Sequence, residues 1–357
     1  MLSQPSFSEI YQNLLTCYDL CQKNKPHIKQ SEFHLDYEYE IYRLAGDIYH
    51  QRYTPQVSSI FLVFHPKPRE IIAASIADRV VHHFIYSYMN PYWERRFVPN
   101  SYACRTGKGP INAMKDVRNF IRSHARHGGR SLYTLKIDVA SFFPSIDLKI
   151  LKRIIFNKLK HPLYKYLVER VLTHRATDEG NYIQKSPQEF WTQIPAHKSM
   201  FNAPKDKGRP IGNLTSQFFA NIYMNEVDQF ISHKIKGILY WQRYVDDLLF
   251  LSDNIETLRG LPKMINDFLL SELEIKLNPS KTILQPIDRG FDHLGYWMKP
   301  NYTLVRRKNV IACRSKLKSK EMDSNSSHRR AIRNSYLGLF KHGDCYGLSQ
   351  SIKEICP

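Results

Sequence analysis

The sequence predicts an α+β protein, and the spacing of its apolar residues supports this fold class. Short β-prone runs lie at 58–64, 132–139, 241–252 and 291–298. Longer segments with apolar residues at helical spacing lie at 7–52, 71–95, 149–173, 215–231 and 255–272. No internal repeat or low-complexity tract is visible. The 357 residues are enough for two or three lobes with a sizeable core.

The charge of the chain points to a polyanionic partner. Its formal net charge is +19, and nucleic acid is the leading partner for a balance this basic. No apolar run approaches the roughly 18 residues of a membrane-spanning helix, so we expect no membrane partner. The six cysteines form no CxxC pair and are expected to be reduced thiols of a cytoplasmic protein.

The N-terminal third combines a helical segment with basic turns. Residues 7–52 are expected to pack as helices, and SSIFLVF is then a strand. In HPKPREI, Pro66 and Pro68 exclude a helix, so Lys67 and Arg69 lie on an extended or turn segment. The segment NSYACRTGKGP is a loop that carries Arg105. Alone, such residues are more often solvated charges, but together they indicate a lobe that grips phosphates.

Two segments in the middle of the chain carry candidate functional residues. The apolar run Leu132–Val139 places Asp138 near a strand end, where an acid is costly unless exposed or bound to a cation. Phe143 follows five residues later. GRPIGNLTSQFFANIYMNEVDQFI reads as a glycine-rich loop running into a helix, for which Thr215 or Ser216 is the expected cap.

The stretch WQRYVDDLLFLS contains the pair of acids on which the interpretation of the other motifs depends. Two β-prone runs flank Tyr-Val-Asp-Asp, which predicts a hairpin whose turn presents Asp246 and Asp247. Adjacent carboxylates repel each other and suit Mg²⁺, although a lone Asp-Asp pair is more often a polar turn. Downstream lie LNPSKT, which contains Lys281, the aromatic strand FDHLGYWM and a basic C-terminal segment. Seven cations in this segment are candidate nucleic-acid contacts: Arg306, Arg307, Lys308, Arg314, Lys316, Lys318 and Lys320.

These acids together suggest one chemistry. If Asp138 lies beside Asp246 and Asp247, three carboxylates can hold two Mg²⁺ ions that activate a primer 3′-hydroxyl and neutralise a triphosphate. The carbonyl of Val139 is a further candidate ligand, and Mn²⁺ is an alternative metal. Phe143 would stand where a ribose 2′-hydroxyl would go, which favours deoxynucleotides.

Six blocks in this order make residues 60–300 resemble a reverse transcriptase: KPRE with SYACRTGKG, KIDVASFFPSID, GRPIGNLTSQ, YVDD, LNPSKT and FDHLGY. The resemblance implies a right-hand polymerase fold with fingers at 61–130, palm at 131–300 and a basic thumb at 301–357. Residues 1–60 precede it as a helical segment, and 174–207 form an insertion in the palm.

The resemblance also implies roles for individual residues. Asp138, Asp246 and Asp247 would be metal ligands, Phe143 the steric gate and Lys281 a proton donor to pyrophosphate. The remaining residues would contact the nucleotide: Lys67, Arg69, Arg105, Ile211, Gly212, Gln217 and Tyr244. Implied partners are a template or non-coding RNA, a DNA primer or cDNA, and dNTPs; an accessory protein or a homo-oligomer stays open.

The loop IGNLTSQ departs from the Gln-Gly start and Ser-Pro end of intron and retroviral-like enzymes. It is similar to the enzymes of diversity-generating retroelements, which copy RNA with frequent errors at adenines. Two alternatives stay open, namely an antiviral defence-associated reverse transcriptase and a catalytically silent RNA-binding scaffold. Ile211, in place of a Gln that could hydrogen-bond near the nascent pair, is expected to loosen base selection.

Overall fold

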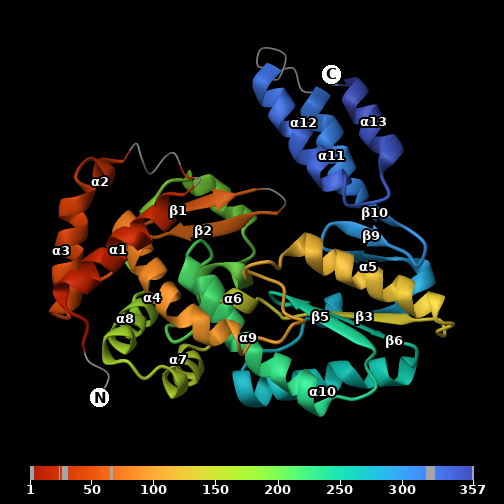
Figure 1. Cartoon of the computed structure of the whole chain (residues 1–357), viewed down its shortest axis with the longest axis horizontal. Coiled ribbons are helices and arrows are strands. Elements are labelled where there is room, and N and C mark those ends of the chain that lie inside the picture. The colour runs from red at the N-terminus through yellow and green to blue at the C-terminus, as the bar shows by residue number, and fades with distance from the viewer. Residues whose placement is uncertain (1–3, 24, 26–30, 65–66, 319–325, 356–357) are drawn as a thin grey trace. The chain divides into compact units, whose positions relative to one another are not determined.

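The computed structural model describes residues 4–23, 25, 31–64, 67–318 and 326–355. The chain forms two compact units, each made of three segments (Figure 1). Unit 1 contains residues 1–98, 139–233 and 265–277, and unit 2 contains residues 99–138, 234–264 and 278–357. The four sequential domains expected from the sequence therefore stay a prediction. Within the described ranges, no helix is both long enough and apolar enough to cross a membrane.

The N-terminal part of unit 1 is a group of helices beside a small sheet. Helices α1 (Phe7–Gln22), α2 (Glu32–Leu35) and α3 (Tyr37–Tyr49) precede β1 (Ser58–Val63) and β2 (Arg69–Ala73). A reciprocal capping box between Ser6 and Glu9 fixes the start of α1. Helix α1 packs on α3 and on α4 (Ile76–Glu94), and the sheet order is β2-β1-β4 with β4 at Tyr182–Gln184.

The expected helix at 71–95 begins later than predicted. Residues 69–73 pair with β1 as strand β2, because Ile72 faces the small core that includes Ile60. Ser75 then caps α4, its hydroxyl accepting from Asp78 N at 3.1 Å. The prediction began too early because the apolar residues of β2 continue the helical spacing of α4 towards the N-terminus.

The rest of unit 1 supplies the helices around the glycine-rich loop. These are α6 (Phe142–Ser145), α7 (Leu148–Lys158), α8 (Pro162–Thr173) and α9 (Leu214–Lys234). Residues 187–202 form the short 3₁₀ helices η2 (Gln188–Gln193), η3 (Ala196–Lys198) and η4 (Met200–Asn202). The expectation that Thr215 or Ser216 caps α9 is wrong. Both lie inside the helix and are fully buried, since α9 already begins at Leu214.

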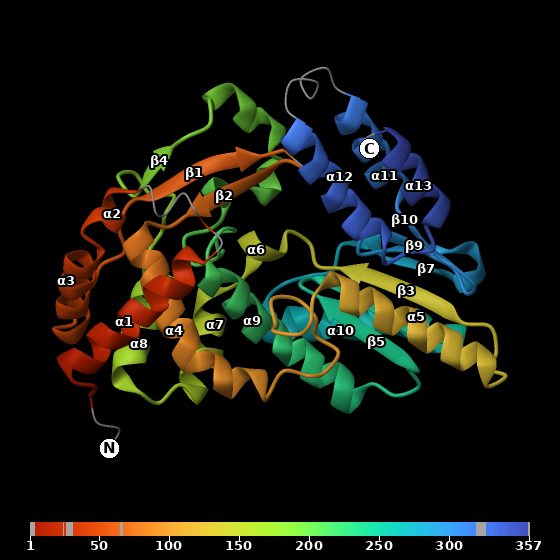
Figure 2. The ribbon, with the colours of Figure 1, turned by 45° about the horizontal axis from the view of Figure 1, so that its top comes forward.

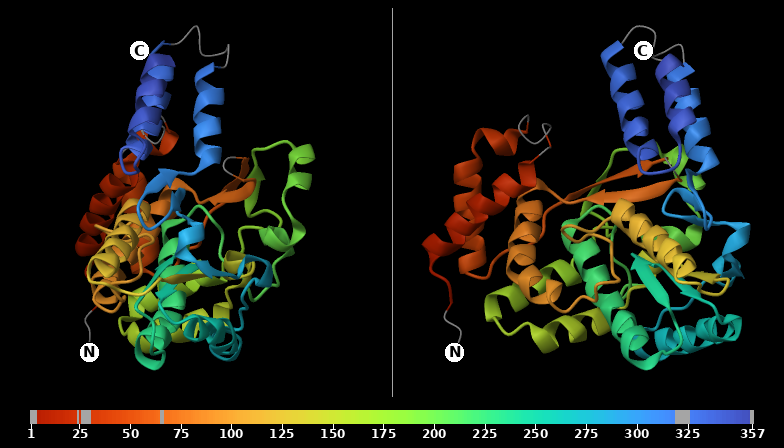
Figure 3. Two further views of the ribbon diagram at one scale, coloured as in Figure 1. Left: turned by 90° about the vertical axis from the view of Figure 1, so that its right-hand side faces the viewer. Right: turned by 45° about the vertical axis from the view of Figure 1, so that its right-hand side comes forward.

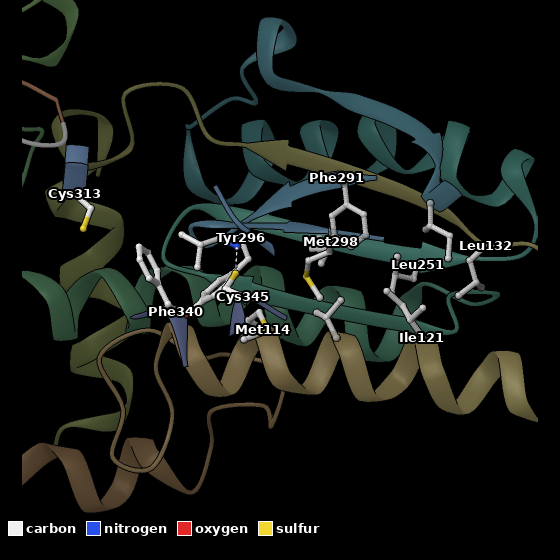
Figure 4. Packing of buried hydrophobic residues seen from close by; sticks show 14 of the residues in the cluster. Met114, Ile121, Leu132, Leu251, Phe291, Tyr296, Met298, Cys313, Phe340 and Cys345 are labelled. Carbon is white, nitrogen blue, oxygen red and sulfur yellow. Dashed lines mark hydrogen bonds between the residues drawn. The ribbon is translucent and has the colours of Figure 1, made fainter. Parts of the chain in front are cut away.

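Unit 2 is built on a four-stranded sheet of order β5-β6-β3-β7. The strands are β3 (Tyr133–Asp138), β5 (Tyr240–Tyr244), β6 (Asp247–Ser252) and β7 (Ile283–Pro286). Helix α5 (Pro110–Arg126) lies along the sheet (Figure 2). Its residues Met114 and Ile121 pack against Leu251 of β6, Phe291 and Met298 in one core (Figure 4). Residues 248–251 of strand β6 are all apolar and buried, as expected for a strand with both faces of its sheet covered.

The C-terminal part of unit 2 is a second sheet followed by helices. The expected single strand at 291–298 is instead a hairpin of β8 (Phe291–His293) and β9 (Tyr296–Met298), because Leu294 and Gly295 adopt the positive φ of a tight turn. Strand β10 (Thr303–Val305) completes the sheet. Helices α11 (Arg307–Lys318), α12 (Ser326–Phe340) and α13 (Tyr346–Ile355) lie side by side (Figure 3). Helix α10 (Ile255–Leu273) agrees with the helix predicted at 255–272, and it begins in unit 2.

Candidate active site

Strand pairing brings two of the three predicted acids together. Strands β3 and β6 are antiparallel, and their register places Asp138 directly opposite Asp247. A hydrogen bond joins the two carboxyl groups. Asp246 precedes Asp247 in the β5–β6 turn, and its carboxyl group is close enough to both acids for their charges to raise its pKa. The predicted convergence of Asp138 with the hairpin is therefore present.

The turn that carries Asp246 has a strained backbone and is held by a hydrogen bond from Arg243. Val245 has a φ of 58°, which is unusual for a β-branched residue. Arg243, whose surface is entirely buried, donates from Nη1 to the Val245 carbonyl at 2.8 Å and from Nη2 to Ser101 Oγ at 2.9 Å. Its backbone also bonds to Asn100 and Tyr102. Backbone strain of this kind persists where surrounding contacts fix the conformation, and it is common at functional sites.

The electrostatics of the site are those of crowded carboxylates. Burial, followed by the charges of Asp138 and Asp247, raises the pKa of Asp246 to about 7. Burial also raises the pKa of Asp247, as do the charge of Asp138 and their hydrogen bond, while Lys136 opposes the shift. Lys136 Nζ is itself held by the carbonyl of Asp292 at 2.6 Å. The site therefore carries more negative charge than its cations balance.

A lysine sits on the first acid. Lys281 forms an ion pair with Asp138 Oδ2. Burial lowers the pKa of Lys281, but the Asp138 contact and the charges of the two other acids outweigh burial and raise it. The 3₁₀ turn η5 (Pro279–Lys281) delivers this side chain. Asn278 N donates to the Asp138 carbonyl at 2.7 Å, and its side-chain oxygen accepts from Ser280 N at 3.2 Å, which fixes the turn.

The donor set fits a divalent cation in its chemistry. Carboxylate oxygens are the ligands that Mg²⁺ prefers, and a cation would relieve the repulsion that raises the pKa of Asp246. Among the described residues, however, no three His, Cys, Asp or Glu side chains are arranged as a complete ligand set. In this structure the ammonium of Lys281 compensates Asp138. Val139, the predicted carbonyl ligand, is buried directly after Asp138.

In unit 1, the glycine-rich loop is docked on β2. Ile72 N donates to the Ile211 carbonyl at 2.8 Å, and Ala74 N donates to Asn213 Oδ1 at 3.1 Å. Gly212 has a φ of 134°, and a Cβ there would lie 2.5 Å from the Ile72 carbonyl oxygen, so only glycine fits. Arg209 N donates to the Phe143 carbonyl at 2.9 Å. Two predicted nucleotide contacts, Phe143 and Ile211, therefore lie on segments of unit 1 that are joined by hydrogen bonds through the glycine-rich loop.

The other predicted nucleotide contacts are distributed over both units. Lys67 and Arg69 are exposed where β1 leads to β2, and Gln217 is exposed on α9. In unit 2, Arg105 donates to the Ser101 carbonyl at 3.0 Å, and burial raises the pKa of Tyr244.

The predicted nucleic-acid contacts cluster on α11. Five of them are exposed: Arg307, Lys308, Arg314, Lys316 and Lys318. Arg306 precedes the helix and is paired with Asp292, so its charge is already compensated. Lys320 lies outside the described residues.

Sequence reasoning missed the residues that support the acids. Arg243 is a charged residue in the middle of a mostly aromatic, buried strand, which was the only sequence signal that it holds the turn. Lys136 stands two residues before Asp138, at a position on the same strand face, and was visible in KIDVA. The role of Asn278 depends on the chain returning beside β3, which no local pattern indicates.

The fold and the acidic hairpin are consistent with a right-hand polymerase. Residues 65–298 match the reverse transcriptase (RNA-dependent DNA polymerase) family, and the chain belongs to this family. It is similar to Protein YkfC of Escherichia coli (strain K12), with 20% identity over 261 residues that cover 64% of this chain and 63% of that protein. It is also similar to Nuclear intron maturase 1, mitochondrial, of Arabidopsis thaliana, with 22% identity over 219 residues, 52% of this chain and 30% of that protein.

Among solved structures, the apo telomerase from Candida tropicalis has a similar fold. Its TM-score is 0.52 at 13% identity, with 79% of this chain and 52% of that chain covered. This likeness concerns the fold, and it agrees with the right-hand polymerase architecture expected from the sequence. The chain spans 63% and 30% of the lengths of its two curated relatives.

Proposed function

We propose that this protein is an RNA-directed DNA polymerase that makes cDNA from a cognate RNA. The observation that carries the proposal is the register of β3 and β6, which places Asp138 opposite Asp247 with Asp246 on the adjoining turn. Membership of the reverse transcriptase family supports it. The substrates would be dNTPs, an RNA template and a DNA primer or growing cDNA.

The three acids would hold Mg²⁺, with Mn²⁺ as the alternative. Bound metal would supply Lewis acidity at the primer hydroxyl and charge neutralisation at the triphosphate. The Val139 carbonyl is the further proposed ligand. Lys281 would leave Asp138 and donate a proton to the departing pyrophosphate, since its raised pKa keeps it protonated until that step.

Selection of the nucleotide would depend on residues of the docked loop and its neighbours. Phe143 would exclude a 2′-hydroxyl, and the exposed backbone of Gly212 would let the nascent pair approach closely. Further nucleotide contacts are proposed for Lys67, Arg69, Arg105, Gln217 and Tyr244. The exposed cations of α11 would contact the phosphates of the template–primer duplex.

We propose that the biological role is the error-prone cDNA synthesis of a diversity-generating retroelement. The sequence IGNLTSQ supports this role, because Ile211 offers an apolar contact where Gln could hydrogen-bond. In the variant Ile211→Gln, errors at template adenines should fall when the cDNA is sequenced. An unchanged error spectrum would contradict the proposed role of Ile211 in loosening base selection. Repeat DNA copied from a co-purified non-coding RNA would instead favour the defence-associated role.

Primer extension on an RNA template with Mg²⁺ tests the activity. We expect full-length product from the wild type, none from Asp247→Asn, and a wild-type amount from the control Asp267→Asn on the exposed face of α10. RNA binding should persist in Asp247→Asn. If the wild type makes no product with any template or primer but still binds RNA, the protein is a catalytically silent scaffold.

A further inference from the structure

Unit 1 contains a buried arginine beside a small cavity that the polymerase site does not use. Arg209 is 3% exposed and lies in the segment that precedes the docked loop. Its Nη1 donates to the carbonyls of Val171 at 3.1 Å and Leu172 at 3.5 Å, at the C-terminal end of α8. These carbonyls carry the negative end of the helix dipole and account for one arm of the guanidinium.

The Nε atom of this guanidinium has no hydrogen-bond partner within the described part of the chain. Among the described residues, no group accepts a hydrogen bond from Arg209 Nε, and His174 Nε2 is likewise buried without a partner. Both side chains line a cavity of about 20 Å³, which exceeds the roughly 10–15 Å³ that one water needs. Two residues that each carry a buried nitrogen without a hydrogen-bond partner therefore line one cavity with room for a single water or a small ion.

The charge around the cavity has one sign. Its lining includes Arg175, Lys207 and Arg209 but no Asp or Glu. Arg175 is compensated by Asp178 at 3.1 Å, and Lys207 by Glu274 at 3.0 Å. No ion pair joins Arg209 to an acid in the described ranges of the chain, and burial lowers its pKa to about 10, so it is still charged at neutral pH.

Two other buried titratable groups, His82 and Asp78, affect the charge in this region. Burial, followed by the charge of Arg209, lowers the pKa of His82 to about 3, which leaves this imidazole neutral. The buried carboxylate of Asp78 accepts hydrogen bonds from Tyr53 Oη at 2.7 Å and from Gln56 N at 2.9 Å, and its charge acts on His174, but no ion pair joins it to Arg209 within the described residues. A buried guanidinium without a direct ion-pair partner is costly, whereas a bound anion would supply a counter-charge and an acceptor for both nitrogen atoms.

We propose that this cavity is a binding site for a small monovalent anion of the chloride class, held by Arg209 Nε and His174 Nε2. The cavity is too small for a phosphate or an organic carboxylate. The site would brace the loop, because Gly208 N donates to the Ile146 carbonyl at 2.8 Å and Arg209 N to that of Phe143 at 2.9 Å. This inference does not depend on polymerase activity.

Thermal unfolding of the whole chain tests the site. The melting temperature of the wild type should rise as chloride replaces gluconate at constant sodium concentration, because gluconate is too large to enter the cavity. In Arg209→Met this rise should be lost or reduced to the level caused by surface binding alone. The control Arg153→Met removes an exposed cation of α7 and should keep the full rise. An equal chloride response in Arg209→Met and Arg153→Met overturns the proposal.

A structural measurement covers the case in which Arg209→Met does not fold. Wild-type crystals grown in bromide should show an anomalous peak beside Arg209 Nε and His174 Nε2. Ordinary water density at that point without an anomalous signal would show that the cavity holds water, and the proposal would be wrong.

Discussion

Replacing Asp246 with Asn should stabilise the metal-free protein while it abolishes DNA synthesis. In the folded protein, burial and the charges of Asp138 and Asp247 raise the pKa of Asp246 from 3.8 to about 7. Above pH 3.8 the unfolded chain releases a proton that the folded protein retains, so stability falls as the pH rises towards 7. Asn removes the charge and almost preserves the shape, and it should therefore remove this loss.

The magnitude follows from the shift. About three pH units at 1.36 kcal/mol each give roughly 4 kcal/mol as an upper limit. Asp246 is partly exposed on its turn, so solvent screening should leave on the order of 1–3 kcal/mol at pH 8. The advantage of Asp246→Asn should be small near pH 4, grow up to pH 7 and stay constant above it.

Urea unfolding in EDTA at pH 4, 6 and 8 measures this difference, with Asp267→Asn as the control for loss of an exposed acid. Adding Mg²⁺ at pH 8 should stabilise the wild type and reduce the difference. If Asp246→Asn is less stable than the wild type at pH 8, or if the difference does not change with pH, carboxylate crowding is not what raises the free energy of the site.

Three further changes test the frame around the acids. Arg243→Met should lower the free energy of unfolding, measured by urea unfolding, by on the order of 1–3 kcal/mol for each acceptor left unpaired. Arg243→Lys should recover only part of this loss. Wild-type stability in Arg243→Met would contradict the role of Arg243 in supporting the turn. Gly212→Ala should lower the free energy of unfolding by about 1–3 kcal/mol from its φ of 134° alone. The control Gly107→Ala, where a Cβ meets nothing within 4 Å, should lower it less. Equal melting temperatures of the two variants would refute the close approach of Gly212 to Ile72. Lys281→Ala should slow single-nucleotide incorporation about 10²–10⁴-fold, and an unchanged rate would exclude Lys281 as the proton donor.

The sequence predicted the acids and their hairpin because both depend on local patterns. The apolar runs around Asp246 and Asp247 have the period of strands, and the turn between them is only two residues long. The opposition of Asp138 and Asp247 required the pairing of β3 with β6, which are more than a hundred residues apart. Only the order of the six family blocks pointed to this pairing.

The missed features have other physical causes. The start of α4 was misplaced because Ile72 is apolar in phase with the helix, although its position is set by pairing with Ile60 of β1. The pattern FDHLGYWM has the composition of a strand throughout, and the turn at Leu294 and Gly295 depends on positive φ values that residue type only half indicates. Contacts such as Lys281 with Asp138 arise from chain return and have no local signature.

The site concentrates two kinds of unfavourable energy at neighbouring residues. Val245 carries backbone strain, and Asp246 and Asp247 carry electrostatic repulsion. Both are tolerated because β6 is buried from Leu248 to Ser252 and Arg243 holds the turn by hydrogen bonds within the same unit. A substitution that relaxes either strain should therefore raise stability and lower activity together, whereas a substitution at Arg243 should lower both. This difference in sign separates residues that carry out the chemistry from residues that hold them in place.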